Sequence, residues 1–189
     1  MDPIYTVPYP EFCVAQQLSK LLPAKQGYSV FAPLSRQERG VDLILARRRR
    51  TGSKVATVQV KSSRTYSDRP SMRKSNRRRF RYYTWFNTFA CPPEADFFCL
   101  VALYPAVDAA EKRELGSWWA PQILLFTQRE MRSFLRDIKT KGGSPDRMFG
   151  FAFDRPTEAV LYRGDARLPD YSAHLLERRV RDLRQFVTR

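Results

Sequence analysis

Apolar residues recur at helical spacing in three segments of the chain. Val14, Leu18 and Leu22 share one side of the first segment, because residues three or four positions apart lie on the same face of a helix. Thr127 precedes the second segment and is a typical N-cap residue. The predicted helices span about residues 11–22, 127–139 and 171–187.

Short runs rich in β-branched and aromatic residues predict strands between these helices. The runs are residues 28–32, 41–46, 55–61, 80–89, 97–104, 122–126, 149–153 and 159–162. Residues 97–104 are apolar throughout, which is typical of a central strand covered on both faces. The chain therefore opens in the order helix, strand, strand, strand, and residues 47–53 form the predicted hairpin loop between the second and third strands.

The length of 189 residues indicates a single domain over residues 1–189. The longest apolar stretch, residues 97–107, contains Pro105 and is too short to cross a bilayer. The N-terminus has neither a basic leader nor an apolar signal segment. Three cysteines without Cys-x-x-Cys spacing indicate reduced thiols and no zinc site. We therefore expect a cytoplasmic protein without a membrane partner.

Positive charge is concentrated in one segment, residues 47–81. The chain has a net charge of +15, and this segment holds 14 basic residues and a single acid, a net of +13. Such a segment predicts a polyanionic partner, and nucleic acid is favoured over a membrane because the segment lacks an amphipathic apolar face. The residues expected to contact DNA phosphates are Arg47, Arg48, Arg49, Arg50, Arg73, Lys74, Arg77, Arg78, Arg79 and Arg81.

The residue types limit the chemistry that the chain can perform. His174 is the only histidine, which argues against mechanisms that need two histidines or a histidine base beside a nucleophile. A surface or packing role is favoured for it on the predicted C-terminal helix. The aromatic residues at positions 82–86 favour a core strand over stacking on bases. Catalysis would then rely on carboxylates, amides, lysine and a metal ion.

Two predicted strands bring polar residues together. Asp42 lies near the start of one strand, and Gln59 and Lys61 lie in the next, on one side of it because side chains alternate. If the strands pair as a hairpin, Asp42 lies across from Gln59 and Lys61. The carboxylate, the amide oxygen and the carbonyl of Val60 would then form an oxygen-rich set that suits Mg²⁺.

In these positions the chain resembles the PD-(D/E)XK nuclease superfamily, which includes restriction enzymes, Holliday-junction resolvases and restriction-type homing endonucleases. The matching residues are Glu11, residues 40–44 (Gly-Val-Asp-Leu-Ile) and residues 58–61 (Val-Gln-Val-Lys). The resemblance implies an α/β fold with a restriction-endonuclease-like core, in which helices flank a central mixed β-sheet in αβββαβ order. It also implies an endonuclease that uses Mg²⁺, with Mn²⁺ as a substitute, on duplex or branched DNA.

The resemblance assigns roles by matched position. Asp42, Gln59 and the carbonyl of Val60 would bind the metal, and Lys61 would orient or help deprotonate the attacking water. Glu11 would hold a water or a second metal. Gln59 stands where the family usually has Glu or Asp, which removes one negative charge and should weaken metal binding.

Two other functions remain open. One is a DNA-binding module that retains the nuclease fold but does not cut, with Gln59 as the trace of lost activity. The other is an RNA-directed nuclease. Glu38 is an alternative acid for the site, and residues 171–187 could supply the interface of a homodimer.

Overall fold

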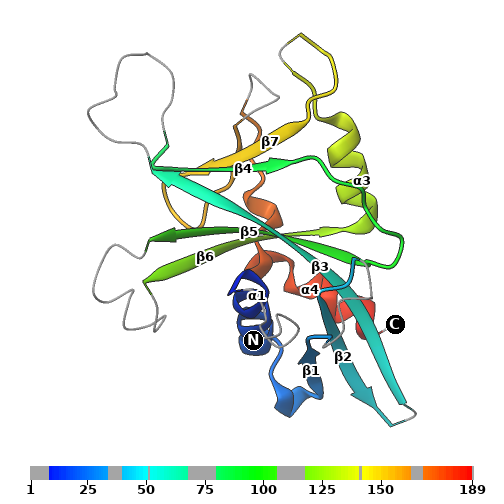
Figure 1. Cartoon of the computed structure of the whole chain (residues 1–189). Helices are drawn as coiled ribbons and strands as arrows, with labels where there is room; N and C mark the ends of the chain where they lie inside the picture. Colours follow the sequence, from blue (N-terminus) through cyan, green and yellow to red (C-terminus); the bar gives the residue numbers. More distant parts are fainter. Residues whose placement is uncertain are drawn as a thin grey trace, which may run out of the picture.

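The computed structural model describes residues 9–33, 40–50, 52–67, 80–105, 118–140, 142–162 and 168–188. In this part of the chain a branched β-sheet has helices packed against it (Figure 1). The helices are α1 (Tyr9–Leu21), α3 (Gln128–Asp137) and α4 (Leu176–Thr188), with short 3₁₀ segments η2 (Ala24–Gln26) and η4 (Ser172–His174). The strands are β1 (Tyr28–Phe31), β2 (Leu43–Arg49), β3 (Gly52–Ser67), β4 (Tyr82–Asn87), β5 (Phe97–Pro105), β6 (Trp119–Thr127), β7 (Met148–Phe153) and β8 (Val160–Leu161).

Strand β3 is the element that joins the two parts of the sheet. Its first half pairs with β2, which pairs with β1, and its last residues pair with β4, which continues to β7 and β8. Along its other edge β3 runs parallel to β5, which pairs with β6. Every pair among the named strands is antiparallel except β3–β5. β3 therefore belongs to both parts of the sheet.

The predicted fold class is wrong. The sheet is mostly antiparallel and has eight strands, in contrast to the expected αβββαβ restriction-endonuclease-like core. Between β3 and β5 the described residues form β4, where that core would have a helix. The aromatic segment 82–87 alternates buried and less buried side chains, and this period of two favours a strand over a helix. β4 then adds a second set of strands to the sheet.

Most individual elements are confirmed. All eight predicted strands are present, and the predicted helices begin and end within a few residues of α1, α3 and the η4–α4 segment. Thr127 caps α3 in a capping box, because its hydroxyl accepts from the Glu130 N–H and the Glu130 carboxylate accepts from the Thr127 N–H. The main difference is β3, which has 16 residues and extends beyond the predicted strand 55–61 at both ends.

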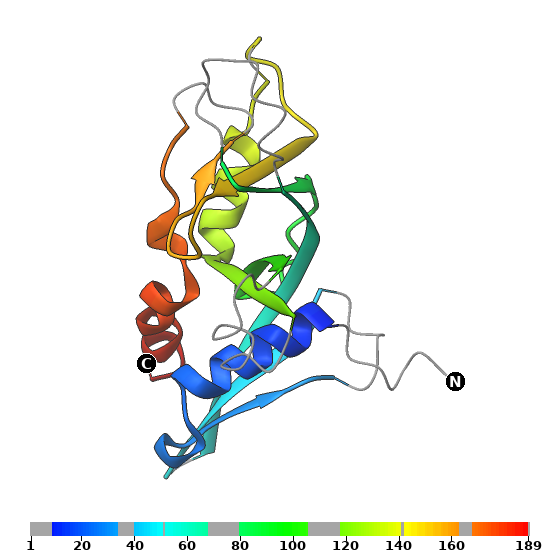
Figure 2. The ribbon, with the colours of Figure 1, turned by 90° about the vertical axis from the view of Figure 1, so that its left-hand side faces the viewer.

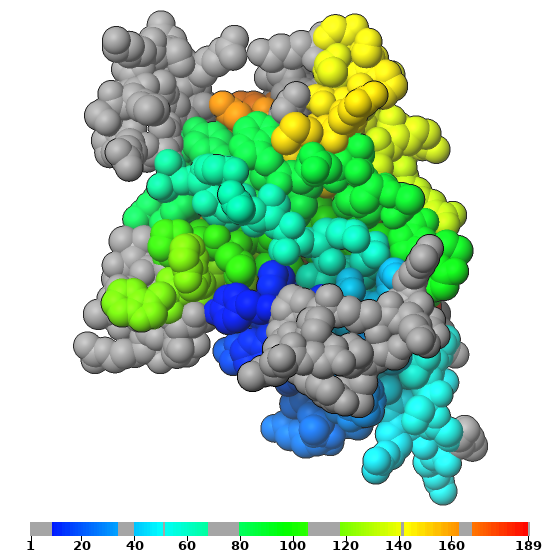
Figure 3. Space-filling view, viewed as in Figure 1, coloured from blue at the N-terminus to red at the C-terminus, as the bar shows by residue number. Residues whose placement is uncertain are grey.

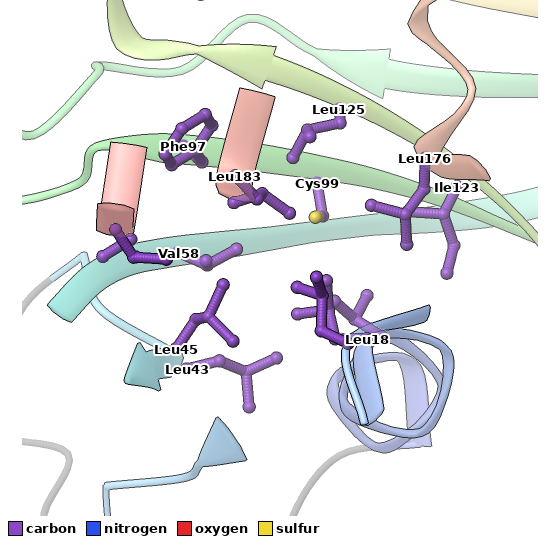
Figure 4. Close-up of a cluster of buried hydrophobic side chains, with 14 of the residues drawn as sticks. Leu18, Leu43, Leu45, Val58, Phe97, Cys99, Ile123, Leu125, Leu176 and Leu183 are labelled. Atoms are coloured by element: carbon purple, nitrogen blue, oxygen red, sulfur yellow. The ribbon is translucent and has the colours of Figure 1, made fainter. Parts of the chain in front are cut away.

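Two apolar clusters cover the opposite faces of the central strands. On one face, α1 and α4 contribute Leu18 and Leu183 to a cluster that also holds Leu43, Val58 and Cys99 (Figure 4). The helix α1 crosses this face (Figure 2). On the other face, α3 packs on a cluster rich in phenylalanine. The apolar residues Leu176, Leu183 and Val187 of α4 are buried in the first cluster.

Cys13, Cys91 and Cys99 are all free thiols. No helix in the described ranges is long and apolar enough to cross a membrane.

Candidate functional site

The candidate site lies where β3 changes partner along one edge. On this edge β3 pairs with β2 as far as Val58 and with β4 only from Thr65. The carbonyls of Val58 and Arg64 both face this edge, since they accept from the Asp42 N–H and from a hydroxyl of β4. Among the described residues no strand pairs with residues 60–63 on this edge. The sheet therefore has a gap here between β2 and β4.

Asp42 lies at this gap, one residue before β2. The register of β2 and β3 places Leu43 opposite Val58, and therefore Asp42 next to Gln59. Oδ2 of Asp42 accepts a hydrogen bond of 2.7 Å from the Val60 N–H, so the carboxylate replaces the next backbone partner of β3. The N–H and C=O of one residue face the same side of an antiparallel ladder, so the Val60 carbonyl also faces the gap.

The negative charge of Asp42 also affects the buried thiol of Cys99. Cys99 of β5 lies opposite Val60 in the parallel pairing. Burial, followed by the negative charge of Asp42, raises the pKa of the Cys99 thiol to about 12. Asp42 is itself half-buried, so its charge lies at the margin of the protein interior, where electrostatic interactions are stronger than in water.

Gln59 is one of few buried polar side chains in the described residues, with 6% of its surface exposed. Its Oε1 is buried and has no hydrogen-bond partner. The backbone of Gly40 closes over this region: a Cβ at Gly40 would lie 2.4 Å from Cγ of Pro92 and 3.7 Å from Nε2 of Gln59. Gly40 also has φ +88°, which favours glycine. The chain therefore keeps an acceptor without a donor beside Asp42.

Lys61 follows Gln59 on the same side of β3. Its Nζ lies 5.5 Å from the centroid of the Phe89 ring, and Phe89 stacks on Phe98 of β5 with ring centroids 6.0 Å apart. A cation over an aromatic face is attracted by the ring quadrupole. The ring limits where the ammonium can go and keeps it on the Gln59 side of the strand. Phe89 was not anticipated, because nothing in the sequence indicates which aromatic residue packs over a given lysine.

The structure does not bring Glu11 into this group. Glu11 lies in the first turn of α1, and α1 packs its residues Val14 and Leu18 on the face that holds Val58. The side chains of Gln59 and Lys61 point to the opposite face, because side chains alternate along β3. Glu11 therefore lies on a helix that covers the face opposite to the Gln59 and Lys61 side chains.

The arginine run 47–50 lies at the far end of β2 from Asp42. At about 3.3 Å per residue, Arg48 lies roughly 20 Å from Asp42 along the strand. Arg47 donates to Oγ1 of Thr188 at 2.5 Å, and Arg49 donates to the Val187 carbonyl at 2.9 Å. These two arginines bind the C-terminal turn of α4, where cations are favoured by the helix dipole.

The exposed Arg48 and Arg50 are left as the candidates for phosphate contacts in this run. The strands extend to the pair Arg49–Gly52, so the predicted loop 47–53 is shorter than expected. Arg81 is exposed beside the other end of β3, with its guanidinium 5.2 Å from the Tyr82 ring centroid. Outside the described residues lie Glu38, Arg73, Lys74, Arg77, Arg78 and Arg79.

The aromatic residues of β4 and the single histidine are packing residues. Tyr82 and Phe86 are 4% and 5% exposed, which confirms the core strand. His174 stacks on Phe126 with ring centroids 4.2 Å apart, and burial lowers its pKa. Beside it, Arg179 binds Glu130 at 2.7 Å and also pairs with Asp182.

Hydrogen bonds have a larger effect than burial on the pKa of Glu130. Burial alone would raise the pKa of this carboxyl, but hydrogen bonds from Arg179 and Thr127 lower it below its usual value. The group is therefore an ionised partner of Arg179 and belongs to the packing of α3 against α4.

A metal ion at the candidate site would have few protein ligands. In the described ranges no three His, Cys, Asp or Glu side chains are placed to hold a metal. The carboxylate of Asp42, the unpartnered Oε1 of Gln59 and the carbonyl of Val60 form an all-oxygen set. Such a set fits Mg²⁺, which binds through one or two carboxylates and keeps several waters.

Comparisons with protein-family models, with curated proteins and with solved structures find no match to this chain.

Proposed function

We propose that the chain is a metal-dependent nuclease that hydrolyses phosphodiester bonds of DNA at Asp42, Gln59, Val60 and Lys61. The observation that carries the proposal is the buried Oε1 of Gln59, which has no hydrogen-bond donor. Gln59 lies opposite Asp42 in the register of β2 and β3. A buried acceptor without a partner costs about 1–3 kcal/mol. Folded proteins rarely bury a polar atom without a hydrogen-bond partner. A metal cation bound at the site would supply the partner that Oε1 of Gln59 lacks.

Each residue has a defined part in the proposed reaction. The Asp42 carboxylate, Gln59 Oε1 and Val60 carbonyl would hold Mg²⁺, which activates water and polarises a phosphate when bound. The Lys61 ammonium offsets the negative charge that develops on the phosphoryl oxygens. The Phe89 ring keeps that ammonium in place, so less reorganisation is needed during the reaction.

The charge distribution supports DNA as the substrate. Exposed arginines lie at both ends of β3: Arg48 and Arg50 near the hairpin, and Arg81 near β4. The candidate residues lie in the middle of the strand. A strand of 16 residues spans roughly 50 Å, so a duplex lying along it could contact both groups of arginines while its backbone passes the site. Phosphate contacts of this kind supply affinity and register.

Cleavage of supercoiled plasmid in Mg²⁺, with EDTA as the reference, tests the proposal. Asp42→Asn removes the charge but keeps an oxygen that can accept from Val60 N–H, so it should fold and lose cleavage. Lys61→Met should also abolish cleavage. Lys54→Met is the matched control, because Lys54 lies on the same strand and also over an aromatic ring, 5.6 Å from the centroid of Phe186.

The results separate cutting from binding. If Lys61→Met cuts as well as Lys54→Met, the proposed site is wrong. If the wild type binds DNA but never cuts in Mg²⁺ or Mn²⁺, the chain is the non-cutting binding module. Gln59→Glu sharpens the test, because an added carboxylate should lower the Mg²⁺ concentration needed for cleavage.

A further inference from the structure

The face of the sheet that α1 covers stays open beyond the helix. Side chains of β3 at even positions point to this face, and those of Ser62, Arg64 and Tyr66 are all exposed. The second half of β3 lies on the front of the molecule in Figure 3, near the first turn of α1 and the start of β6. This face of β3 is therefore accessible beyond α1.

Large aromatic side chains gather on this open face. Tyr66 is 52% exposed, Trp119 is 50% exposed and Trp118 is 70% exposed. The strand register places Tyr66 and Trp119 on one face, because Arg64 lies opposite Leu103, two residues before Pro105, and Pro105 lies opposite Trp119. We call Tyr66 and Trp119, with Arg64 on the same face of β3, the aromatic surface, and Trp118 directly precedes it in the chain.

Large aromatic side chains that gather at the surface indicate a binding site. Many aromatic rings in the described residues are buried, including Tyr82 and Phe86 of β4, whereas Tyr66 and Trp119 are left at the surface. Exposed rings next to an arginine, in a chain with net charge +15, combine stacking with attraction to phosphate. Proteins that bind single-stranded nucleic acids use this combination, because every base has a face on which an aromatic ring can stack.

We propose that the aromatic surface binds unpaired nucleotides by stacking. The side chains of Gln59 and Lys61 point to the opposite face of β3, so this surface is separate from the proposed nuclease site. The binding can therefore be measured in the absence of cleavage.

Binding is measured in EDTA with fluorescently labelled oligo(dT), oligo(U) and a duplex of equal length. Oligo(dT) or oligo(U) should bind more tightly than the duplex, and the two single strands distinguish DNA from RNA. The intrinsic tryptophan fluorescence should be quenched on binding, because Trp118 and Trp119 are two of the three tryptophans. Trp119→Ala should weaken single-strand binding about 5- to 150-fold, and Trp119→Phe should restore most of it.

Phe31→Ala is the matched control. Phe31 is 55% exposed on β1, away from the aromatic surface, so its removal should change the affinity less than twofold. Equal affinity for single strands and duplex, with no effect of Trp119→Ala or Tyr66→Ala, overturns the inference. So does self-association of the wild type that Trp119→Ala abolishes, because the surface would then bind a second copy.

The two proposals fail separately. Single-strand binding without cleavage of any substrate leaves the aromatic surface and refutes the nuclease. Cleavage of DNA by a protein that binds single strands and duplex equally well, with no effect of Trp119→Ala on either, leaves the nuclease and refutes the aromatic surface.

Discussion

Replacing Gln59 with methionine should make the protein more stable and inactive. Methionine is unbranched and close to glutamine in size, so it can occupy the same buried space. It removes the oxygen that has no hydrogen-bond partner, and such an atom costs about 1–3 kcal/mol when buried. Allowing for imperfect packing of the new side chain, we expect the free energy of unfolding to rise by about 1 kcal/mol, which raises Tm by about 2–4 °C for a chain of this size.

The metal dependence of stability gives a second measurement. A ligand that binds only the folded state stabilises it by RT ln(1 + [L]/Kd), about 1.4 kcal/mol when the ligand is at ten times its Kd. Mg²⁺ should therefore raise Tm of the wild type, and Gln59→Met should lose this increment together with cleavage. Thermal unfolding followed by circular dichroism, in EDTA and in increasing Mg²⁺, measures both effects.

Gln122→Met is the matched control. Gln122 is also buried, at 3% exposure, but its Nε2 donates to the carbonyls of Pro156 at 3.2 Å and Glu158 at 2.6 Å. Its removal leaves those carbonyls without a donor and should lower the free energy of unfolding by about 1–3 kcal/mol. If Gln59→Met destabilises as much as Gln122→Met, the amide of Gln59 has a structural partner and the reasoning fails.

Two further predictions concern the basic residues and the histidine. The double variant Arg47→Ala, Arg49→Ala should lower the free energy of unfolding by about 1–2 kcal/mol, because both arginines bind the end of α4. The double variant Arg48→Ala, Arg50→Ala should leave unfolding by urea unchanged. It should reduce the salt dependence of DNA binding by the amount expected for roughly two phosphate contacts. Because burial lowers the pKa of His174 below 6.5, the unfolded state binds a proton first, so stability should fall as pH is lowered from about 7.5 through 6.5. His174→Phe should flatten this part of the Tm profile, and an unchanged slope would count against the assignment.

Local patterns predicted the elements better than their arrangement. The helix at Thr127 and the strand 97–104 have signals within a few residues, namely a cap and a continuous apolar run. The branching of the sheet has no such signal. β4 pairs with β7, about 65 residues away along the chain, and only this pairing shows that the segment after β3 continues the sheet. The expected αβββαβ order failed at this point.

The extent of β3 shows a similar limit. The segment Ser62-Ser63-Arg64 is polar, so the strand was expected to end at Lys61. In the structure β5 supplies backbone partners along this stretch, and the polar side chains lie at the surface. Tertiary pairing therefore overrides the weak local preference. The arginine run was equally ambiguous, because only the contacts with α4 distinguish Arg47 and Arg49 from their neighbours.

The juxtaposition of Asp42 and Gln59 depends on the distant end of their hairpin. Asp42 lies next to Gln59 because Arg49 pairs with Gly52, and each step back along β2 is matched by a step forward along β3. A register shift of one residue would place Asp42 opposite Val60 and turn the side chains of β2 to the other face. The buried residues Leu43 and Leu45 oppose such a shift, since they would leave the core. The apolar core of the hairpin therefore fixes the one polar pair on which the proposed chemistry depends.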